Sequence, residues 1–146
     1  MLPLEAFVER VLASGVLSRS LTELRPPASL QDIGKTEARL ERRLPDTLRA
    51  LLGRWDGANL DVVRLVPCDT LEVQEEGLYF ANDPAGFMYF LDSEDRVVVL
   101  DTDGGGLKAV AANVDDFLTG YVFGSRSEEF MGARWLAELK VAGLAT

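Results

Sequence analysis

Apolar residues recur every three or four positions along the first third of the chain, which is the spacing of an amphipathic helix. Residues 4–12 show this spacing first. A second helix is indicated by Ser29 with Asp32 three residues later, a pattern close to a capping box. Pro45 interrupts that helix and suits the first turn of a third one. The third helix is expected to stop at DGAN, residues 56–59, whose glycine and asparagine tolerate positive φ.

Beyond residue 60 the period shortens to about 2, as in strands. The candidate strands are residues 62–67, 78–81, 87–91, 96–100 and 107–111. Their short connections predict an antiparallel meander. Helices return at Asn113, a suitable N-cap, and a last helix is expected from Ser127 to residue 143. The predicted fold class is α+β: a largely antiparallel sheet of about five strands, with N-terminal and C-terminal helices packed on it.

The clearest turn signal is DPAG, residues 83–86, between two stretches rich in aromatic residues. Aspartate at the first position, proline at the second and glycine at the last fit a type I turn. A catalytic loop and a ligand cradle are the alternatives, but the simplest interpretation is the corner of a β-hairpin.

The chain contains no histidine and one cysteine. The first fact excludes Ser-His-Asp and Cys-His catalysis and His-ligated zinc. The second excludes an internal disulfide and fits a reducing compartment, so Cys68 is expected to be structural. We expect no catalytic residue and no cofactor. An enzyme that uses carboxylates at strand ends is a remote alternative.

The segment DTDGGG, residues 101–106, begins like a calcium loop, because Asp101 and Asp103 are two residues apart. The later EF-hand ligand positions, however, are Gly105 and Ala112, which offer no side-chain oxygen. We interpret the segment as a glycine-rich turn and predict no metal, while cation binding by DTDGGG itself stays open.

Acidic residues at positions 5 and 9 make the N-terminus unlike a signal peptide, and no segment approaches the roughly 18 apolar residues of a membrane span. A cytoplasmic protein that does not bind membranes is therefore expected. Residues 1–54 carry nine basic and seven acidic residues, whereas residues 55–146 carry six and 17, a balance of −11. This balance disfavours direct nucleic-acid binding and favours a basic protein partner. Alternatively, the acidic turns only keep the protein soluble.

Rigid aromatic side chains among acids would make a protein-binding surface, provided that helices cover only one face of the sheet. The predicted partner-binding residues are Asp83, Phe87, Tyr89, Asp92, Glu94, Asp95, Asp101 and Asp103. Oligomeric state is not predicted.

The order of several short motifs resembles the SUKH superfamily, which includes the yeast cell-wall-assembly regulator and bacterial toxin-immunity proteins. These motifs are LP at 44–45, LRALLGRWDGANL at 48–60, GLYFANDPAGFMYFLD at 77–92, RVVVLDTD at 96–103 and AVAANVDDFL at 109–118. The family often has a polar residue directly after the hairpin glycine, where this chain has Phe87. That departure suggests a more apolar surface here.

The resemblance implies a single domain, residues 1–146, with an N-terminal helix and connector at 1–28, a family-like core at 29–120 and a C-terminal helix at 121–146. It also implies a non-catalytic immunity protein that binds and neutralises a cognate toxin, often a nuclease. A regulatory adaptor in signalling or cell-wall assembly is the alternative.

Overall fold

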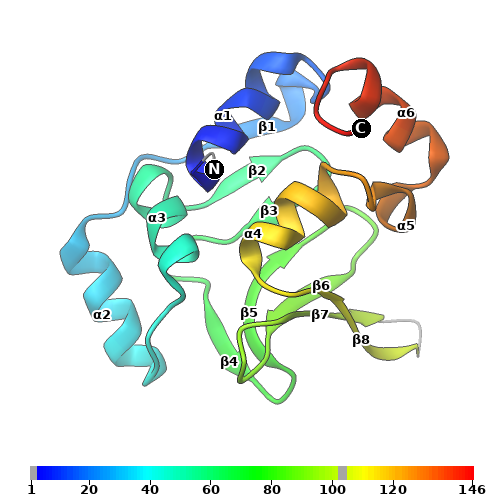
Figure 1. Ribbon diagram of the computed structural model, residues 1–146. Helices are drawn as coiled ribbons and strands as arrows, with labels where there is room; N and C mark the ends of the chain where they lie inside the picture. The colour runs from blue at the N-terminus through cyan, green and yellow to red at the C-terminus, as the bar shows by residue number, and fades with distance from the viewer. Residues whose placement is uncertain (1–2, 102–104) are drawn as a thin grey trace.

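A computed structural model describes residues 3–101 and 105–146 of the protein, and the predicted α+β fold is confirmed (Figure 1). The helices of these residues are α1 (Leu4–Ser14), α2 (Leu30–Leu40), α3 (Asp46–Arg54), α4 (Val114–Asp116), α5 (Ser127–Met131) and α6 (Ala133–Val141). A 3₁₀ turn, η1 (Arg19–Leu21), follows α1, and a π-helical segment, η2 (Phe117–Val122), continues α4. None of the helices in the described ranges is both long and apolar enough to cross a membrane.

The strands of the described residues form one antiparallel sheet in the order β1-β2-β3-β5-β6-β7-β8, with β4 paired to β5 beside β3. Their bounds are β1 (Thr22–Leu24), β2 (Ala58–Leu60), β3 (Arg64–Leu65), β4 (Glu72–Gln74), β5 (Gly77–Asn82), β6 (Met88–Leu91), β7 (Val97–Asp101) and β8 (Gly106–Ala111). The predicted meander is correct for β5 to β8.

The predicted strand count was too low, because β1, β2 and β4 were not predicted. Each of them has three residues, which is too short for a recognisable alternation of apolar and polar positions. β1 and β2 exist because distant segments pair, as when Thr22 in β1 lies opposite Leu60 in β2, whereas β4 pairs with the adjacent β5. The candidate strand at residues 62–67 is shorter than expected and contributes only β3.

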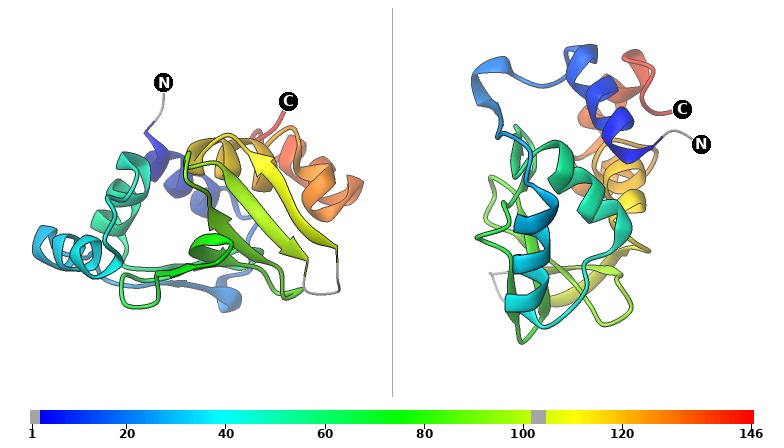
Figure 2. Two further views of the ribbon diagram at one scale, coloured as in Figure 1. Left: turned by 90° about the horizontal axis from the view of Figure 1, so that it is seen from below. Right: turned by 90° about the vertical axis from the view of Figure 1, so that its left-hand side faces the viewer.

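The helices pack beside one another and against the sheet, and the core lies between these layers. In Figure 1, α1 and α6 lie together at one end of the molecule, while β4 to β8 lie at the other. Arg10 Nη2 of α1 donates a hydrogen bond to the Gly143 carbonyl at 2.9 Å, which joins the two terminal helices. The third helix, α3, contacts α1, α2 and α4, and α2 lies at its side (Figure 2).

The start of α2 is the predicted one, and the capping box is complete. Ser29 Oγ accepts a hydrogen bond from the Asp32 N–H at 3.0 Å, and the Asp32 carboxylate accepts one from the Ser29 N–H at 3.4 Å. The expected single last helix is wrong, because it divides into α5 and α6 at Gly132, whose φ is +91°. The break lets Trp135 bury its ring and donate its indole N–H to the Val122 carbonyl at 2.8 Å.

Candidate functional site

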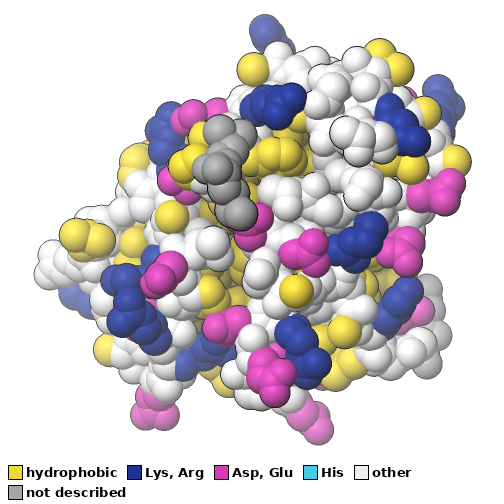
Figure 3. Space-filling view, viewed as in Figure 1, with side chains coloured by type: hydrophobic (Ala, Val, Ile, Leu, Met, Phe, Trp, Pro, Cys, Tyr) yellow, Lys and Arg dark blue, Asp and Glu magenta, His cyan; other side chains and the backbone are white. Residues whose placement is uncertain are grey.

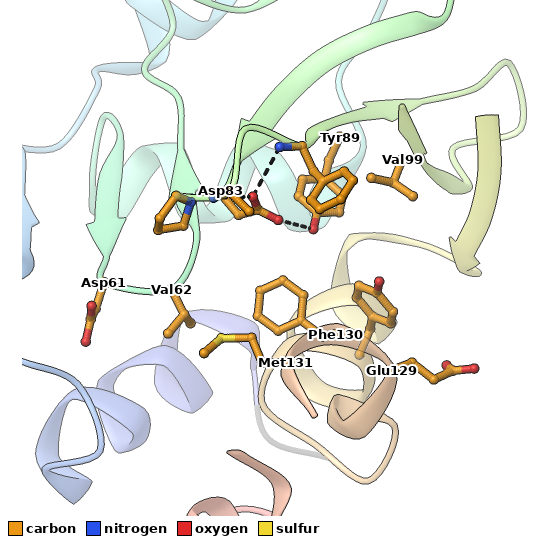
Figure 4. A pocket seen from close by; sticks show the side chains of 12 residues that line it. Asp61, Val62, Asp83, Tyr89, Val99, Glu129, Phe130 and Met131 are labelled. Atoms are coloured by element: carbon orange, nitrogen blue, oxygen red, sulfur yellow. Dashed lines mark hydrogen bonds between the residues drawn. The ribbon is translucent and has the colours of Figure 1, made fainter. Parts of the chain in front are cut away.

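The hairpin corner between β5 and β6 faces helix α5 across a cleft of about 390 Å³ (Figure 4). We call this corner, residues 83–87, the Asp83 corner. The side chains that line the cleft come from the β2–β3 connection, the Asp83 corner, β6, β7, η2 and α5, and they are Asp61, Val62, Asp83, Pro84, Ala85, Phe87, Tyr89, Val99, Tyr121, Glu129, Phe130 and Met131.

The Asp83 corner is the predicted hairpin turn. The Gly86 N–H donates to the Asp83 carbonyl at 3.0 Å, and the Asp83 N–H donates to the Phe87 carbonyl at 3.1 Å, which closes the hairpin. Gly86 has a φ of +94°, a conformation that costs other L-residues free energy. The Asp83 carboxylate supports the same turn, because Oδ1 accepts from the N–H groups of Ala85 and Phe87 at 3.0 and 3.2 Å.

The second carboxylate oxygen of Asp83 is held by Tyr89, whose phenol donates to Oδ2 at 2.7 Å (Figure 4). Tyr89 is only 1% exposed, and its ring centroid lies 4.9 Å from that of Phe117. Burial, together with the hydrogen bond to Asp83 and its negative charge, raises the pKa of Tyr89 far above its usual range. The phenol therefore stays protonated and fixes the carboxylate in the cleft wall.

The opposite wall of the cleft comes from η2 and α5. Tyr121 leaves η2 towards the cleft, and its ring lies 5.5 Å from the ring of Phe130, measured between centroids. In Figure 4, Phe130 and Met131 project from α5 towards Asp83 and Tyr89. Burial first, then the negative charges of Glu129 and Asp83, raises the pKa of Tyr121. Both walls are thus apolar or aromatic, with carboxylates between and beside them.

Sequence reasoning missed this second wall, because it predicts one uninterrupted helix over residues 127–143. The available signal was Gly132, which directly follows the apolar pair Phe130 and Met131. A glycine at that place favours a helix end, and a helix end allows the preceding pair to face a different surface from Trp135.

The cleft gathers Asp83, Phe87 and Tyr89 of the predicted partner-binding residues. Asp101 lies at the same end of the sheet, because Leu100 of β7 pairs with Met88 of β6. Asp103 lies outside the described residues. Phe87 is half-buried and Tyr89 almost wholly buried, and the large hydrophobic side chains exposed in the described ranges include no aromatic one. The expected exposed aromatic anchors are therefore recessed into a cleft instead.

The remaining predicted residues, Asp92, Glu94 and Asp95, lie at the far end of β6, in the turn to β7. We call residues 92–96 the Asp92 corner. Asp92 Oδ1 accepts from the N–H groups of Glu94 and Arg96, and Oδ2 accepts from Arg96 Nε at 2.9 Å. Burial alone would raise the pKa of Asp92, but these hydrogen bonds and the guanidinium charge outweigh it and lower the pKa.

Asp95 at the Asp92 corner pairs with Arg42 Nη2 at 2.5 Å, so this corner carries its own cations. Over the face seen in Figure 3, acidic and basic side chains are interspersed rather than gathered by sign. The excess of acid in residues 55–146 therefore does not form one continuous acidic patch on that face.

Cys68 is 6% exposed, and burial is the main reason why its pKa is raised to about 11. A thiol with such a pKa is a poor nucleophile at neutral pH, which fits a structural role. Across residues 3–101 and 105–146, His, Cys, Asp and Glu side chains nowhere gather in threes that could hold a metal ion. Of the Asp101-x-Asp103 pattern, Asp103 lies outside these ranges.

Comparison with known protein families shows what kind of domain carries the cleft. The model of the SMI1/KNR4 family (SUKH-1) matches residues 27–120, and the chain therefore belongs to this family. No curated protein matches the chain. The family match contains the Asp83 corner, whereas Tyr121 and the three α5 residues of the cleft lie beyond it.

Proposed function

We propose that this SUKH-1 domain is an immunity protein, a non-catalytic domain that binds a basic bacterial toxin domain and neutralises it. The proposal rests on the carboxylates of the cleft, which lack ion-pair partners among the described residues. Among the described residues, Asp61, Asp83 and Glu129 line the cleft, and none of them forms an ion pair with a cation of this chain. A partner's Lys or Arg can therefore bind there without displacing an internal cation.

The contrast with the Asp92 corner supports this assignment. There, a partner's cation would compete with Arg96 for Asp92 and with Arg42 for Asp95. Negative potential accelerates encounter with a basic protein, and close pairing at a recessed site slows dissociation. If the toxin is a nuclease, its basic surface also serves to hold phosphates, so covering that surface would block its substrate.

A carboxylate enzyme receives no comparable support from the geometry. Two catalytic carboxylates must converge on one reacting atom. In Figure 4, Asp61 and Glu129 lie at opposite ends of the cleft with their carboxylates directed away from Asp83. Asp83 itself is held in its turn by two backbone N–H groups and the Tyr89 phenol, none of which is a second carboxylate that could act with it.

The test is a tagged pull-down from the native host, washed at low and at high salt, with the bound proteins identified by mass spectrometry. We expect one basic partner with a toxin-like domain, weakened by salt. Asp83→Asn should reduce its recovery, while the matched variant Asp92→Asn should not. Both substitutions keep an oxygen that can accept the turn hydrogen bonds, and both remove one charge.

Two other outcomes would contradict the proposal. Recovery of several signalling or cell-wall proteins would favour the regulatory adaptor. Equal loss of the partner in both variants would show that total charge, and not the cleft, controls binding.

A further inference from the structure

We infer that the cleft receives an arginine side chain of the partner, with the guanidinium at Asp83 and the aliphatic stem against Phe130 and Met131. That the arginine belongs to a basic protein rests on the proposed function. The choice of side chain rests on the residues of the cleft itself.

The lining of the cleft is complementary to a cation. Among the described residues, it contains three carboxylates and no Lys or Arg. Arg64 lines a neighbouring hollow that shares Asp61, Asp83 and Pro84 with the cleft, but among the described residues it forms no ion pair with either acid. Arg126 is bound to Asp116 Oδ2 at 2.7 Å and to the Val110 carbonyl. A cationic group is therefore what the cleft lacks.

The Asp83 carboxylate also has hydrogen-bonding capacity left. A carboxylate has about four acceptor sites. Three are used, by the N–H groups of Ala85 and Phe87 and by the Tyr89 phenol. All three donors are neutral, so they fix the orientation of the carboxylate and leave its charge uncompensated. Such a group accepts a charged N–H donor at little ordering cost, because the carboxylate is already held in place.

The aromatic lining favours arginine over lysine. The rings of Phe87, Tyr121 and Phe130 line the cleft beside Asp83. A guanidinium is planar, is more weakly hydrated than an ammonium and stacks on aromatic faces. An ammonium would have to give up more of its hydration to enter the same apolar surroundings. Arginine fits a recessed carboxylate between aromatic walls better than lysine does.

The two walls of the cleft come from different parts of the chain. Asp83, Phe87 and Tyr89 lie within the family match at residues 27–120, whereas Phe130 and Met131 lie beyond it on α5. Helix α5 ends at Gly132, where the positive φ turns the chain into α6 and leaves the apolar pair facing the cleft. The second wall is thus a feature of the segment that follows the family core, and we assign to it the contact with the arginine stem.

The experiment titrates ¹⁵N-labelled protein with acetyl-Gly-Arg-Gly-amide, followed by amide chemical shifts. The same peptide with citrulline is the neutral isostere, and the peptide with lysine is the alternative cation. We expect saturable shifts at residues 83–89 and 129–131, with the citrulline peptide binding about tenfold or more weakly because a charge-assisted bond is lost. Asp83→Asn and Phe130→Ala should weaken arginine binding, while Asp92→Asn and Val73→Ala, at an exposed site in β4, should not.

The inference is overturned if citrulline binds as tightly as arginine, if lysine binds as tightly or more tightly, or if the shifts lie at the Asp92 corner. Well-dispersed spectra of each variant separate lost binding from lost folding.

The pull-down distinguishes failure of this inference from failure of the proposed function. A basic toxin partner that Asp83→Asn and Phe130→Ala both retain at wild-type levels would leave the function standing and reject the cleft as its arginine site. Arginine binding in the titration with no toxin captured from the host would support the site and reject the immunity function.

Discussion

The two corners of the β5–β6–β7 meander share the same backbone and Oδ1 hydrogen bonds. Each corner begins with an aspartate, Asp83 or Asp92. The N–H of this aspartate donates to the carbonyl of the residue four positions later, and its carbonyl accepts a hydrogen bond from the N–H of the residue three positions later. In each, Oδ1 accepts from the second and fourth N–H groups that follow. The fourth residue has a positive φ in both, +94° at Gly86 and +61° at Asp95.

The difference lies in the partner of the second carboxylate oxygen. Oδ2 of Asp83 accepts from the phenol of Tyr89, whereas Oδ2 of Asp92 accepts from the guanidinium of Arg96. One acid is held in place by a neutral group and keeps its charge available, and the other is neutralised within the turn. A count of acidic residues therefore overstates the negative charge that a partner can reach.

The largest effect on stability is expected at the Asp83 corner, from loss of the Tyr89 side chain. Tyr89→Ala should lower the free energy of unfolding by about 3–5 kcal/mol, since it leaves a cavity beside Phe117. Tyr89→Phe keeps the ring and should cost about 1.5–3 kcal/mol through the lost hydrogen bond to a charged group. Urea denaturation measures both. Equal losses for the two variants would mean that the phenol, not the ring, dominates.

The next largest effect on the free energy of unfolding is expected at the fourth residue of each corner, which has a positive φ. Gly86→Ala should cost about 1–2 kcal/mol, because an L-side chain is disfavoured in the left-handed region. At the equivalent position of the other corner, Asp95→Asn keeps a residue type that tolerates positive φ and loses only the partly exposed Arg42 pair, so it should cost less than about 1 kcal/mol. Thermal or urea denaturation of the two variants checks the order. A neutral Gly86→Ala would show that the corner can adopt another turn.

A smaller effect depends on pH and belongs to the Asp92 corner. The pKa of Asp92 is lowered in the folded state, so its contribution is present above the unfolded pKa, about 3.9, and is lost as the pH falls through the folded value. At neutral pH, Asp92→Asn should cost about 0.5 kcal/mol after allowance for solvent screening. The difference from the wild type should vanish in acid. A difference that persists at a pH well below the folded pKa would contradict the ionic contribution.

The smallest effect is expected for Arg96→Gln. The Arg96 side chain is 54% exposed, so its pair with Asp92 is strongly screened by water. The variant should be slightly less stable than the wild type in dilute buffer and indistinguishable from it in about 1 M salt, where the Debye length is roughly 3 Å. Denaturation curves at the two salt concentrations test this. A loss that is independent of salt would point to packing of the side-chain stem instead.

Local sequence rules were sufficient for the Asp83 corner, the capping box of α2 and the four-stranded meander, because each depends on residues within a few positions of one another. They were insufficient for β1 and β2, which are held by pairing between distant segments, and for β4, whose three residues are too few to show a strand pattern although it pairs with the adjacent β5. The same limit applies to the ion pair that joins Asp95 to Arg42, 53 residues earlier.

The hairpin side of the candidate site was predictable, because it also depends on residues that are close together in the sequence. Asp83, Phe87 and Tyr89 belong to one hairpin, so the turn signal locates them together. The facing wall depends on where η2 and α5 lie relative to the sheet, and no spacing of residues in the sequence predicts that position. Predicting that wall would have required the break at Gly132 and the irregular geometry of η2.

The π-helical geometry of η2 makes the length of this segment as important as its composition. The Phe123 N–H donates to the carbonyl of Leu118, five residues earlier, instead of four as in an α-helix. Removing one residue would restore ordinary helical spacing and rotate everything that follows by roughly 100° about the helix axis, carrying Phe130 away from Asp83. The same rotation would displace Trp135 and Leu139, which are buried in the core, so the length of η2 is fixed by core packing as well as by the α5 wall of the cleft.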